Sequence, residues 1–278
     1  MKTLLALLLA LPMMAQAANL LYYPQGFESA VKSGQLKDAA LKSKIFEILT
    51  NAHQKIPGKN DIVGSNCSGN CVKHTTLGYN RARTLMFGKI DLKQDARGYY
   101  VEDVYCQQEM TGKGIGPNKI PDNTIVNCEH TWPQSKFTGS FPNEMQKSDL
   151  HHLYATSSRA NSTRGNNPFG EVNGPLPFSG CEVSRTGKVP NKNGGSSEIQ
   201  VFQPPREQQG NTARSLFYFS VRYKISIDKM QEETLRKWNK DDPVTPEDIA
   251  RNDAIEQEQG DRNPFIDFPE LADSIADF

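Results

Sequence analysis

The middle of the chain is rich in residues that interrupt regular structure, and this feature limits the possible fold more than any other. Residues 107–124 and 165–199 are dense in Gly, Pro, Asn and Ser, which predicts long loops. Alternating and β-branched residues predict short strands at 98–106 and 197–205. We therefore expect a small irregular sheet whose long connections carry the functional motifs.

The two ends of the chain have helical patterns instead. Residues 27–56 have apolar side chains at near-helical spacing, with one interruption at Gly34, and helix formers return from Thr212 onward. Thr245 precedes Pro246, and a capping residue followed by a first-turn proline begins many helices. Together with the central sheet, this pattern predicts an α+β fold with flanking helices and long loops.

Two finer predictions concern helix ends. Residues 78–90, GYNRARTLMFGKI, have a helical composition, and Gly88 is expected to end that helix. His53 is expected on the last turn of the first helical segment, near the negative end of the helix dipole. His53 is therefore interpreted as a structural residue and not as a ligand.

The N-terminus has the pattern of an export signal. MKTLLALLLALPMMAQA combines an early lysine, an apolar run and small residues before the expected cleavage site. The run is shorter than the ~20 apolar residues of a membrane-spanning helix. We predict a signal peptide over residues 1–17, a single mature domain over residues 18–278, no membrane segment, and a periplasmic or secreted location.

The cysteines bear on the same compartment, because all five lie in the exported part, where disulfides can form. An odd number leaves at least one thiol free, and the sequence does not choose among the possible pairings. No second Cys/His pair follows Cys67 and Cys71 at zinc-ligand spacing, so a disulfide is favoured there. Cys128 is expected to be packed or bridged, and not to act as a nucleophile.

Charge is distributed unevenly, although the formal net charge is +0. From Asp241 to Phe278 there are twelve acidic residues against Arg251 and Arg262. Residues 18–240 consequently carry 29 basic and 20 acidic side chains. A basic body with an acidic tail is compatible with a nucleic-acid substrate.

Polar residues between positions 129 and 164 supply the groups that metal-assisted phosphodiester cleavage requires. Glu129 and Asn161 offer oxygen ligands for a hard cation, and His130 offers a base with a pKa near neutrality. Cations are needed to meet the charge on phosphate oxygens. The nearby cations are Lys136, Arg159 and Arg164.

The pattern also predicts how these groups meet. Adjacent residues of a regular strand point to opposite faces, so Glu129 and His130 can share a site only at a strand end or bulge. If residues 155–166 form a short helix, Asn161 lies on it beside that strand end. A second strand carrying His152 would complete a compact ββα unit around one ion.

Two other interpretations stay open on these residues alone. His151 and His152 are compatible with a zinc site, and hence with a zinc hydrolase. A nucleic-acid-binding protein that keeps the fold without catalysis is compatible with the basic body. HExxH, GxSxG and GxxxxGK[ST] motifs are absent from the sequence, so the usual signatures of metalloproteases, α/β-hydrolases and phosphate-loop enzymes are missing.

Three segments occur together in the order CEHTWPQSKF (residues 128–137), KSDLHHLY (residues 147–154) and NSTRGNNPFGEV (residues 161–172). They resemble the signature of the bacterial endonuclease I family, secreted or periplasmic nucleases with a ββα-metal (His-Me finger) core. TLGYNRARTLMFGKIDL, VYCQQEMTG, GPNKIPDN and QGDRNPFIDFPE also resemble family segments. The resemblance therefore covers nearly the whole mature chain.

The resemblance implies roles for individual residues. His130 matches the histidine that acts as general base on water. Glu129 and Asn161 match the two ligands of a single divalent ion. His152 matches a polar residue that stabilises or orients the site, and Arg164 corresponds to a helix arginine that contacts phosphate.

One family residue has no counterpart here. Related members carry a transition-state arginine between the base and the SDL motif, whereas the stretch from Thr131 to Met145 contains no arginine. Lys136 is the only cation in that stretch, so Lys136 or an arginine from another loop is expected to take its place.

The implied function is hydrolysis of phosphodiester bonds without sequence specificity. DNA is the implied substrate, and RNA is a second candidate substrate. The implied cofactor is one Mg²⁺ ion, for which Mn²⁺ or Ca²⁺ can substitute. Water deprotonated by His130 would attack phosphorus in line, so activity should fall below the pKa of that histidine. No membrane partner is expected, and the protein is expected to be a monomer.

Overall fold

The computed structural model describes residues 19–112, 114–192, 194 and 197–278. The predicted signal peptide over residues 1–17 lies outside this part of the chain. Within it, no helix combines the length and the apolar character that crossing a membrane would require.

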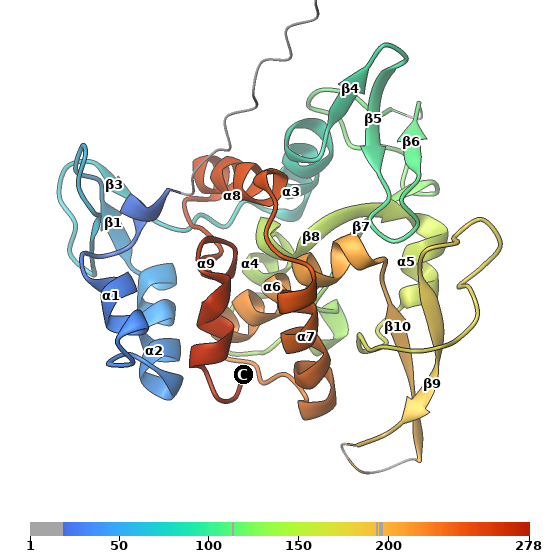
Figure 1. Ribbon diagram of the computed structural model, residues 1–278. Helices are drawn as coiled ribbons and strands as arrows, with labels where there is room; N and C mark the ends of the chain where they lie inside the picture. The colour runs from blue at the N-terminus through green and yellow to red at the C-terminus, as the bar shows by residue number, and fades with distance from the viewer. Residues whose placement is uncertain (1–18, 113, 193, 195–196) are drawn as a thin grey trace, which may run out of the picture.

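Helices and short strands alternate along the described residues (Figure 1). The helices are α1 (Phe27–Lys32), α2 (Asp38–Thr50), α3 (Tyr79–Leu85), α4 (Asn143–Lys147), α5 (Ser158–Arg164), α6 (Arg206–Tyr223), α7 (Lys229–Asp241), α8 (Pro246–Gln259) and α9 (Pro264–Asp267). Single 3₁₀ turns are η1 (Leu20–Tyr22), η3 (Gln134–Lys136), η4 (Leu150–His152) and the longer η5 (Pro269–Ser274), and η2 (Met86–Ile90) is a π-helical turn. The strands are β1 (Ala52–Gln54), β2 (Ile62–Gly64), β3 (Cys71–Val72), β4 (Lys93–Asp95), β5 (Gly98–Glu102), β6 (Glu109–Thr111), β7 (Val126–His130), β8 (Leu153–Ser157), β9 (Arg185–Pro190) and β10 (Glu198–Gln203).

The mixed helix and strand content confirms the α+β class, but the single small sheet that the sequence predicts is wrong. The described strands pair into separate antiparallel sheets, in the orders β2-β1-β3, β4-β5-β6, β7-β8 and β10-β9. Strands this short, joined by Gly- and Pro-rich connections, pair within small local groups and do not join into one sheet. The β9 strand also lies inside the stretch that was expected to be all loop.

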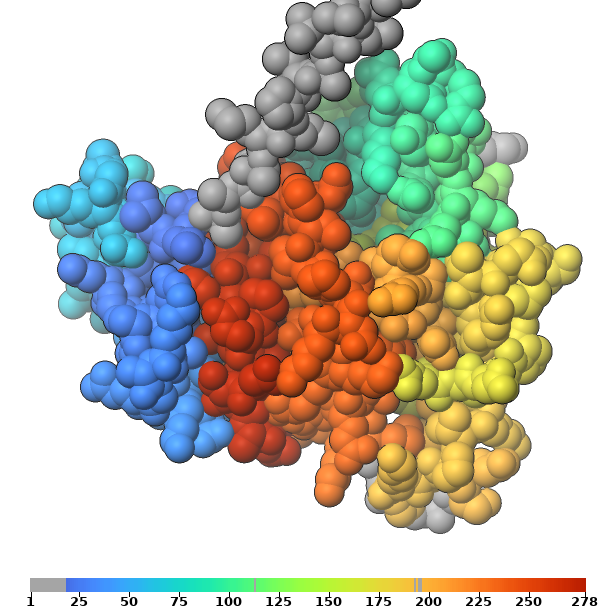
Figure 2. Space-filling model, in the orientation of Figure 1, coloured from blue at the N-terminus to red at the C-terminus, as the bar shows by residue number. Residues whose placement is uncertain are grey.

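The longest helix, α6, forms the centre of the largest hydrophobic cluster. It packs against α2, α7, α9 and η4, so nearly all of its residues are buried. It begins at Arg206, earlier than the expected Thr212, directly after Pro204 and Pro205. Polar residues in its first turns are buried by neighbouring segments, which is why hydrophobic periodicity did not reveal them. Figures 1 and 2 show the C-terminal helices between α1 and α2 on one side and the β9-β10 hairpin on the other.

The first helical segment is interrupted near Gly34, as predicted, but it ends at Thr50, so the predicted helical position of His53 is wrong. His53 lies in the middle of β1 and is buried. Its Nε2 is 2.8 Å from the carbonyl oxygen of Ile48, and its Nδ1 is 3.0 Å from Oδ2 of Asp61. The ring therefore satisfies polar groups at the junction of helix and strand.

The helix that begins at Tyr79 does not end at Gly88, which corrects the expected stop. The chain continues through this glycine in the π-helical turn η2. A Cβ atom at Gly88 would lie 2.6 Å from the backbone nitrogen of Asn118. The glycine is needed because a loop packs directly on the helix backbone, not because the helix terminates there.

The strand predicted over residues 98–106 ends at Glu102, and β6 lies inside the predicted loop 107–124, whereas two other predicted boundaries agree with the structure. Helix α8 begins with a capping box, in which the Thr245 side chain accepts from Asp248 N and the Asp248 side chain accepts from Thr245 N, and Pro246 occupies the first helical position. Strand β10 ends before the two prolines that were expected to stop it.

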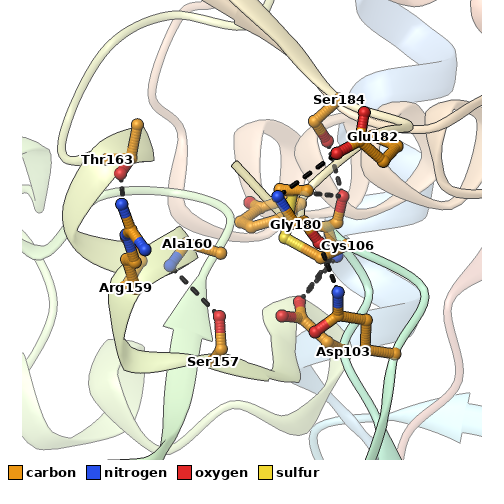
Figure 3. The surroundings of a disulfide bond; sticks show 12 residues. Asp103, Cys106, Ser157, Arg159, Ala160, Thr163, Gly180, Glu182 and Ser184 are labelled. Carbon is orange, nitrogen blue, oxygen red and sulfur yellow. Dashed lines mark hydrogen bonds between the residues drawn. A yellow bond between two sulfur atoms is a disulfide. The ribbon is translucent and has the colours of Figure 1, made fainter. Parts of the chain in front are cut away.

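The disulfides join Cys67 to Cys71, as predicted, and Cys106 to Cys181. Cys128 is a free, buried thiol, which fits the packed alternative of the prediction, and burial raises its pKa to about 12. Figure 3 shows the second disulfide, which ties the segment after β5 to the loop before β9.

Candidate active site

Strand β7 and helix α5 line a single pocket, and strand β8 pairs with β7 behind it. The strands pair antiparallel, with Glu129 opposite Tyr154 and His130 opposite Leu153. The Ser157 side chain accepts a hydrogen bond from Ala160 N and caps α5, so the helix begins directly where β8 ends. Glu129, His130 and Asn161 all line the same pocket, whose volume is about 240 Å³.

Adjacent positions on β7 reach one pocket because the strand ends at His130, as the sequence argument required. Val126 and Cys128 pack into a hydrophobic cluster with Leu153 and Ala155 of β8, which fixes the register of the strand pair. Beyond the strand, Thr131 N donates to the carbonyl oxygen of His152 over 3.0 Å.

The carboxylate of Glu129 is 1 % exposed and is oriented by two donors. The Tyr105 hydroxyl donates to Oε1 over 2.8 Å, and Arg164 Nη1 lies 3.0 Å from the same oxygen. Burial raises the pKa of Glu129, and the Arg164 charge and the Tyr105 hydrogen bond oppose that increase. Because both donors use Oε1, the second carboxylate oxygen remains to bind a cation.

The imidazole of His130 is held at both ring nitrogens. Its Nε2 lies 3.1 Å from the carbonyl oxygen of Lys147, and its Nδ1 lies 3.4 Å from Nε2 of Gln134. A carbonyl can only accept a hydrogen bond, so the ring proton belongs on Nε2 and Nδ1 keeps its lone pair. Burial, followed by the neighbouring His152, lowers the pKa of His130 to about 3. The ring is therefore neutral at physiological pH.

Asn161 projects from α5 toward the end of β7. Its Nδ2 donates to the carbonyl oxygen of Cys128 over 3.3 Å. This hydrogen bond orients the amide and leaves Oδ1 as the atom that can bind an ion.

The donor set fits a hard divalent ion better than zinc. A carboxylate and an amide oxygen are ligands that Mg²⁺ accepts while it keeps several waters. In the described part of the chain, no three His, Cys, Asp or Glu side chains are grouped to hold a metal. A zinc site built on His151 and His152 therefore has no third ligand of these types there.

The two adjacent histidines lie in η4, so the prediction that a strand carries His152 is wrong. His151 Nε2 is 3.2 Å from the carbonyl oxygen of Asp261, and His152 Nε2 is 2.8 Å from that of Gln146. His151 thus faces away from His152 and toward the backbone. The 3₁₀ turn directs the two histidine side chains to different sides, as the alternation of a strand would also do.

His152 is buried behind His130, with ring centroids 5.2 Å apart, and does not line the pocket. Its own ring packs on Phe219, and burial lowers its pKa to about 4. The contact is compatible with the predicted role of orienting the base.

Arg164 is 2 % exposed and is one of the residues that line the pocket. Besides Glu129, its guanidinium donates to the carbonyl oxygens of His130 over 3.2 Å and of Thr131 over 2.7 Å. It therefore ties α5 to the end of β7, and most of its donors are used within the protein. A phosphate could bind Arg164, as predicted, only in addition to these partners within the protein.

The other two predicted cations lie away from the pocket. Arg159 stacks its guanidinium 4.2 Å from the ring of Phe178, on the side of α5 near the Cys106–Cys181 disulfide (Figure 3). Lys136 lines a neighbouring pocket of about 180 Å³ together with Trp132. Neither side chain borders the pocket that contains His130.

Sequence reasoning missed several residues that shape the site. Tyr105 orients Glu129, the Lys147 carbonyl orients His130, and Gln134 contacts the unprotonated ring nitrogen. Tyr79 forms one wall of the pocket, with its ring 5.5 Å from that of His130. All four lie inside segments that resemble the family, but no local pattern indicates that Tyr79, Tyr105 or the Lys147 carbonyl reaches this pocket.

Comparison with known proteins gives a consistent family assignment. The family model described as Endonuclease I matches residues 40–270. Similar proteins include an extracellular ribonuclease from Bacillus subtilis (strain 168), 35% identical over 73% of this chain and 69% of the relative. Another is an extracellular ribonuclease from Bacillus amyloliquefaciens, 35% identical over 60% of this chain and 58% of the relative. An extracellular deoxyribonuclease from Aeromonas hydrophila is 29% identical over 43% of this chain and 48% of its own length. The chain thus spans about half to two thirds of these relatives.

Proposed function

The chain belongs to the endonuclease I family, and from that premise we propose that it is an exported endonuclease that hydrolyses phosphodiester bonds in DNA and RNA. The proposal includes a single nuclease domain over residues 18–278, with β7, β8 and α5 as its ββα-metal core. Relatives named as ribonucleases and as deoxyribonucleases support the choice of both nucleic acids.

One observation carries the proposal: a neutral imidazole and two oxygen ligands converge on one pocket. His130 offers the lone pair of Nδ1, Glu129 offers Oε2, and Asn161 offers Oδ1. A general base beside a cation site is the minimum that metal-assisted attack of water on phosphorus requires.

In the proposed mechanism, Nδ1 of His130 takes a proton from a water molecule as its oxygen attacks phosphorus in line. The Lys147 carbonyl, which accepts from Nε2, stabilises the imidazolium that forms. The bond from phosphorus to the 3′ oxygen breaks, and that oxygen takes up a proton from solvent. The products are a 5′-phosphate and a 3′-hydroxyl.

The cofactor in this proposal is one Mg²⁺ ion held by Glu129 and Asn161. A bound divalent ion neutralises charge on the phosphate oxygens and assists the leaving group. Tyr105 and Arg164 hold the Glu129 carboxylate in place for this role, and Cys128 O holds the Asn161 amide. Metal ligands in proteins are generally oriented by hydrogen bonds of this kind from neighbouring residues.

Lack of base specificity follows from the kind of groups present. The pocket offers cation ligands and a base for the phosphate, and phosphate contacts carry no sequence information. Export to the periplasm or medium fits the N-terminal signal pattern and the relatives named extracellular.

The direct test is cleavage of supercoiled plasmid and of total RNA by the chain from residue 18 onward, with Mg²⁺ or with EDTA. We expect degradation of both that EDTA abolishes and that His130→Ala reduces at least about 10²-fold. Undiminished cleavage by His130→Ala would remove this residue as the base, and no cleavage with any divalent ion would refute the nuclease function.

A further inference from the structure

A phosphodiester brings negative charge into the pocket, and that charge needs a cation besides the proposed ion. Arg164 uses Nη1 and Nη2 on Glu129 and on two backbone carbonyls, and its Nε is buried without a partner among the described residues. Lys136 and Arg159 border other surfaces. The cations that were predicted near the motif therefore leave the open side of the pocket without an uncommitted positive charge.

Two cations lie over one aromatic ring, that of Tyr79. The Arg83 guanidinium lies 4.6 Å from the ring centroid of Tyr79, and the Lys147 ammonium lies 4.4 Å from the same centroid. Tyr79 itself lines the pocket, with its ring 5.5 Å from that of His130. Both positive charges are consequently held by cation–π contacts against a ring that lines the pocket, although neither side chain is itself among the lining residues.

Neither cation is neutralised by a carboxylate in the described part of the chain. Arg83 Nη2 donates to the neutral amide oxygen of Asn80 over 2.6 Å, and its buried Nε has no hydrogen-bond partner among the described residues. By contrast, Arg81 on the same helix and Lys89 on the turn that follows both pair with Glu258. A positive charge that no acid neutralises favours the binding of an anion, and a phosphate placed at His130 would supply one.

The fold brings these cations together through two contacts. The Glu144 carboxylate accepts a hydrogen bond from Tyr79 N, which joins the start of α3 to α4. Lys147 is the last residue of α4. Its carbonyl oxygen accepts a hydrogen bond from His130 Nε2, and its ammonium lies over the ring of Tyr79. The same short helix thus orients the base and presents a cation next to it.

We propose that Arg83 and Lys147, held against Tyr79, form a phosphate-binding pair that contacts the nonbridging oxygens of the phosphate placed at His130. This proposal rests on the proposed nuclease function and extends it, since it identifies the cations that meet the reacting phosphate. Tyr79 positions the pair and closes that side of the pocket.

The test compares Lys147→Met and Arg83→Met with matched controls in the full chain from residue 18. The Lys147 substitution keeps the backbone carbonyl that orients His130. Arg81→Met is the control for the arginine, because it lies on the same helix and pairs with an acid. Lys224→Met is the control for the lysine, because its ammonium also lies over a ring, that of Phe46, far from the pocket.

Two readouts are measured: kcat/KM with Mg²⁺ on a duplex oligonucleotide, and the salt dependence of its binding in EDTA. We expect each test variant to lose roughly 100-fold in kcat/KM and to reduce the salt slope by about 0.9 for each lost phosphate contact. Arg83→Lys, which keeps the charge, should recover part of the loss. The control variants should behave like the wild type.

The outcomes separate this proposal from the nuclease function itself. An inactive wild type would refute the nuclease function. An active wild type with test variants that match their controls would overturn the phosphate-binding pair alone. Loss of activity with an unchanged salt slope would also overturn it, because the residues would then act only through the position of His130. If Arg83→Met does not fold, Lys147→Met and Arg83→Lys decide the question.

Discussion

At the scale of single residues, the neutral state of His130 comes from its neighbours. The ring is enclosed by Tyr79, Phe137 and His152, and this burial disfavours the charged form. The Lys147 carbonyl selects the tautomer, because it requires a proton on Nε2. Nδ1 therefore keeps the lone pair that would accept a proton, and the Gln134 amide, which faces it over 3.4 Å, would have to give way to a water molecule.

Glu129→Ala should reduce stability as well as activity. The substitution leaves the Arg164 guanidinium buried without its carboxylate, and removing one partner of a buried ion pair costs about 3 kcal/mol. Urea unfolding in EDTA measures this loss in the free energy of unfolding without any contribution from a metal. A variant that unfolds at the wild-type urea concentration would show that the pair does not stabilise the fold.

Asn161→Ala should weaken the divalent ion and leave the fold nearly unchanged. Asn161 is only half-buried and gives one long hydrogen bond to Cys128 O, so its removal costs little stability. We expect the Mg²⁺ concentration for half-maximal cleavage to rise on the order of 100-fold. Asn161→Asp, which keeps an oxygen ligand, should recover part of the affinity, and an unshifted Mg²⁺ titration for Asn161→Ala would exclude this residue as a ligand.

The sequence allowed the prediction of the residues that meet locally, and it missed those that arrive from other segments. Glu129, His130 and Asn161 belong to one recognisable run, and they do line one pocket. Tyr105 reaches Glu129 across 24 positions, and Lys147 reaches His130 across 17. Such contacts depend on how segments pack, which local patterns do not encode.

At the scale of secondary structure elements, the segment after β5 supports the site through a buried turn. Asp103 Oδ1 accepts from Tyr105 N over 2.9 Å and from the Thr156 hydroxyl of β8 over 2.7 Å. Ser184 donates to the carbonyl oxygen of Tyr105 over 2.6 Å, and the adjacent Cys106 is bonded to Cys181. The disulfide thus holds the tyrosine that orients Glu129.

Removal of the Cys106–Cys181 disulfide should therefore lower activity, whereas removal of Cys67–Cys71 should not. The bridges span 75 and 4 positions, so the loop-entropy argument assigns them about 4 and about 2 kcal/mol of stability. Paired Cys→Ala variants should be compared by urea unfolding and by kcat/KM well below their unfolding midpoints. Equal activity in the two variants would show that the longer bridge does not position Tyr105.

Element prediction succeeded where local rules dominate and failed where packing overrides them. The capped start of α8 at Thr245 and Pro246 follows from backbone chemistry alone. Gly88 does not end its helix, because its small size serves a loop that packs on it. The separate small sheets were not foreseen, because a strand's partner is set by the path of the chain between strands.

At the scale of the whole molecule, a buried polar network joins distant parts of the chain. Tyr218 of α6 donates toward Asp149 and Asp261, and His74 Nδ1 lies 2.9 Å from Oδ2 of Asp261. The Gln259 amide bridges the two carboxylates as well. The network connects the C-terminal region to η4, whose His152 packs on the proposed base.

The buried histidines give stability two opposing dependences on pH. Burial lowers the pKa of His74, but Asp261 outweighs it and raises that pKa, so its stabilisation is complete below about pH 6.5 and is lost as pH rises through the raised value. The pKa values of His130 and His152 are lowered to about 3 and about 4. Below about pH 6.5 these two histidines become protonated in the unfolded chain but stay neutral in the folded protein. The free energy of unfolding therefore falls as pH decreases below this value.

These opposing effects predict maximal stability near pH 6.5, and His74→Gln isolates the alkaline side of it. The free energy of unfolding of wild type minus that of the variant should be largest below about pH 6.5 and should shrink as pH rises, because only the charged imidazole attracts Asp261. Urea unfolding in EDTA across this range measures the difference, and Asp261→Asn provides the control, since a neutral partner removes the attraction. A difference that stays constant with pH would mean that His74 contributes by packing alone and that its charge does not stabilise the network.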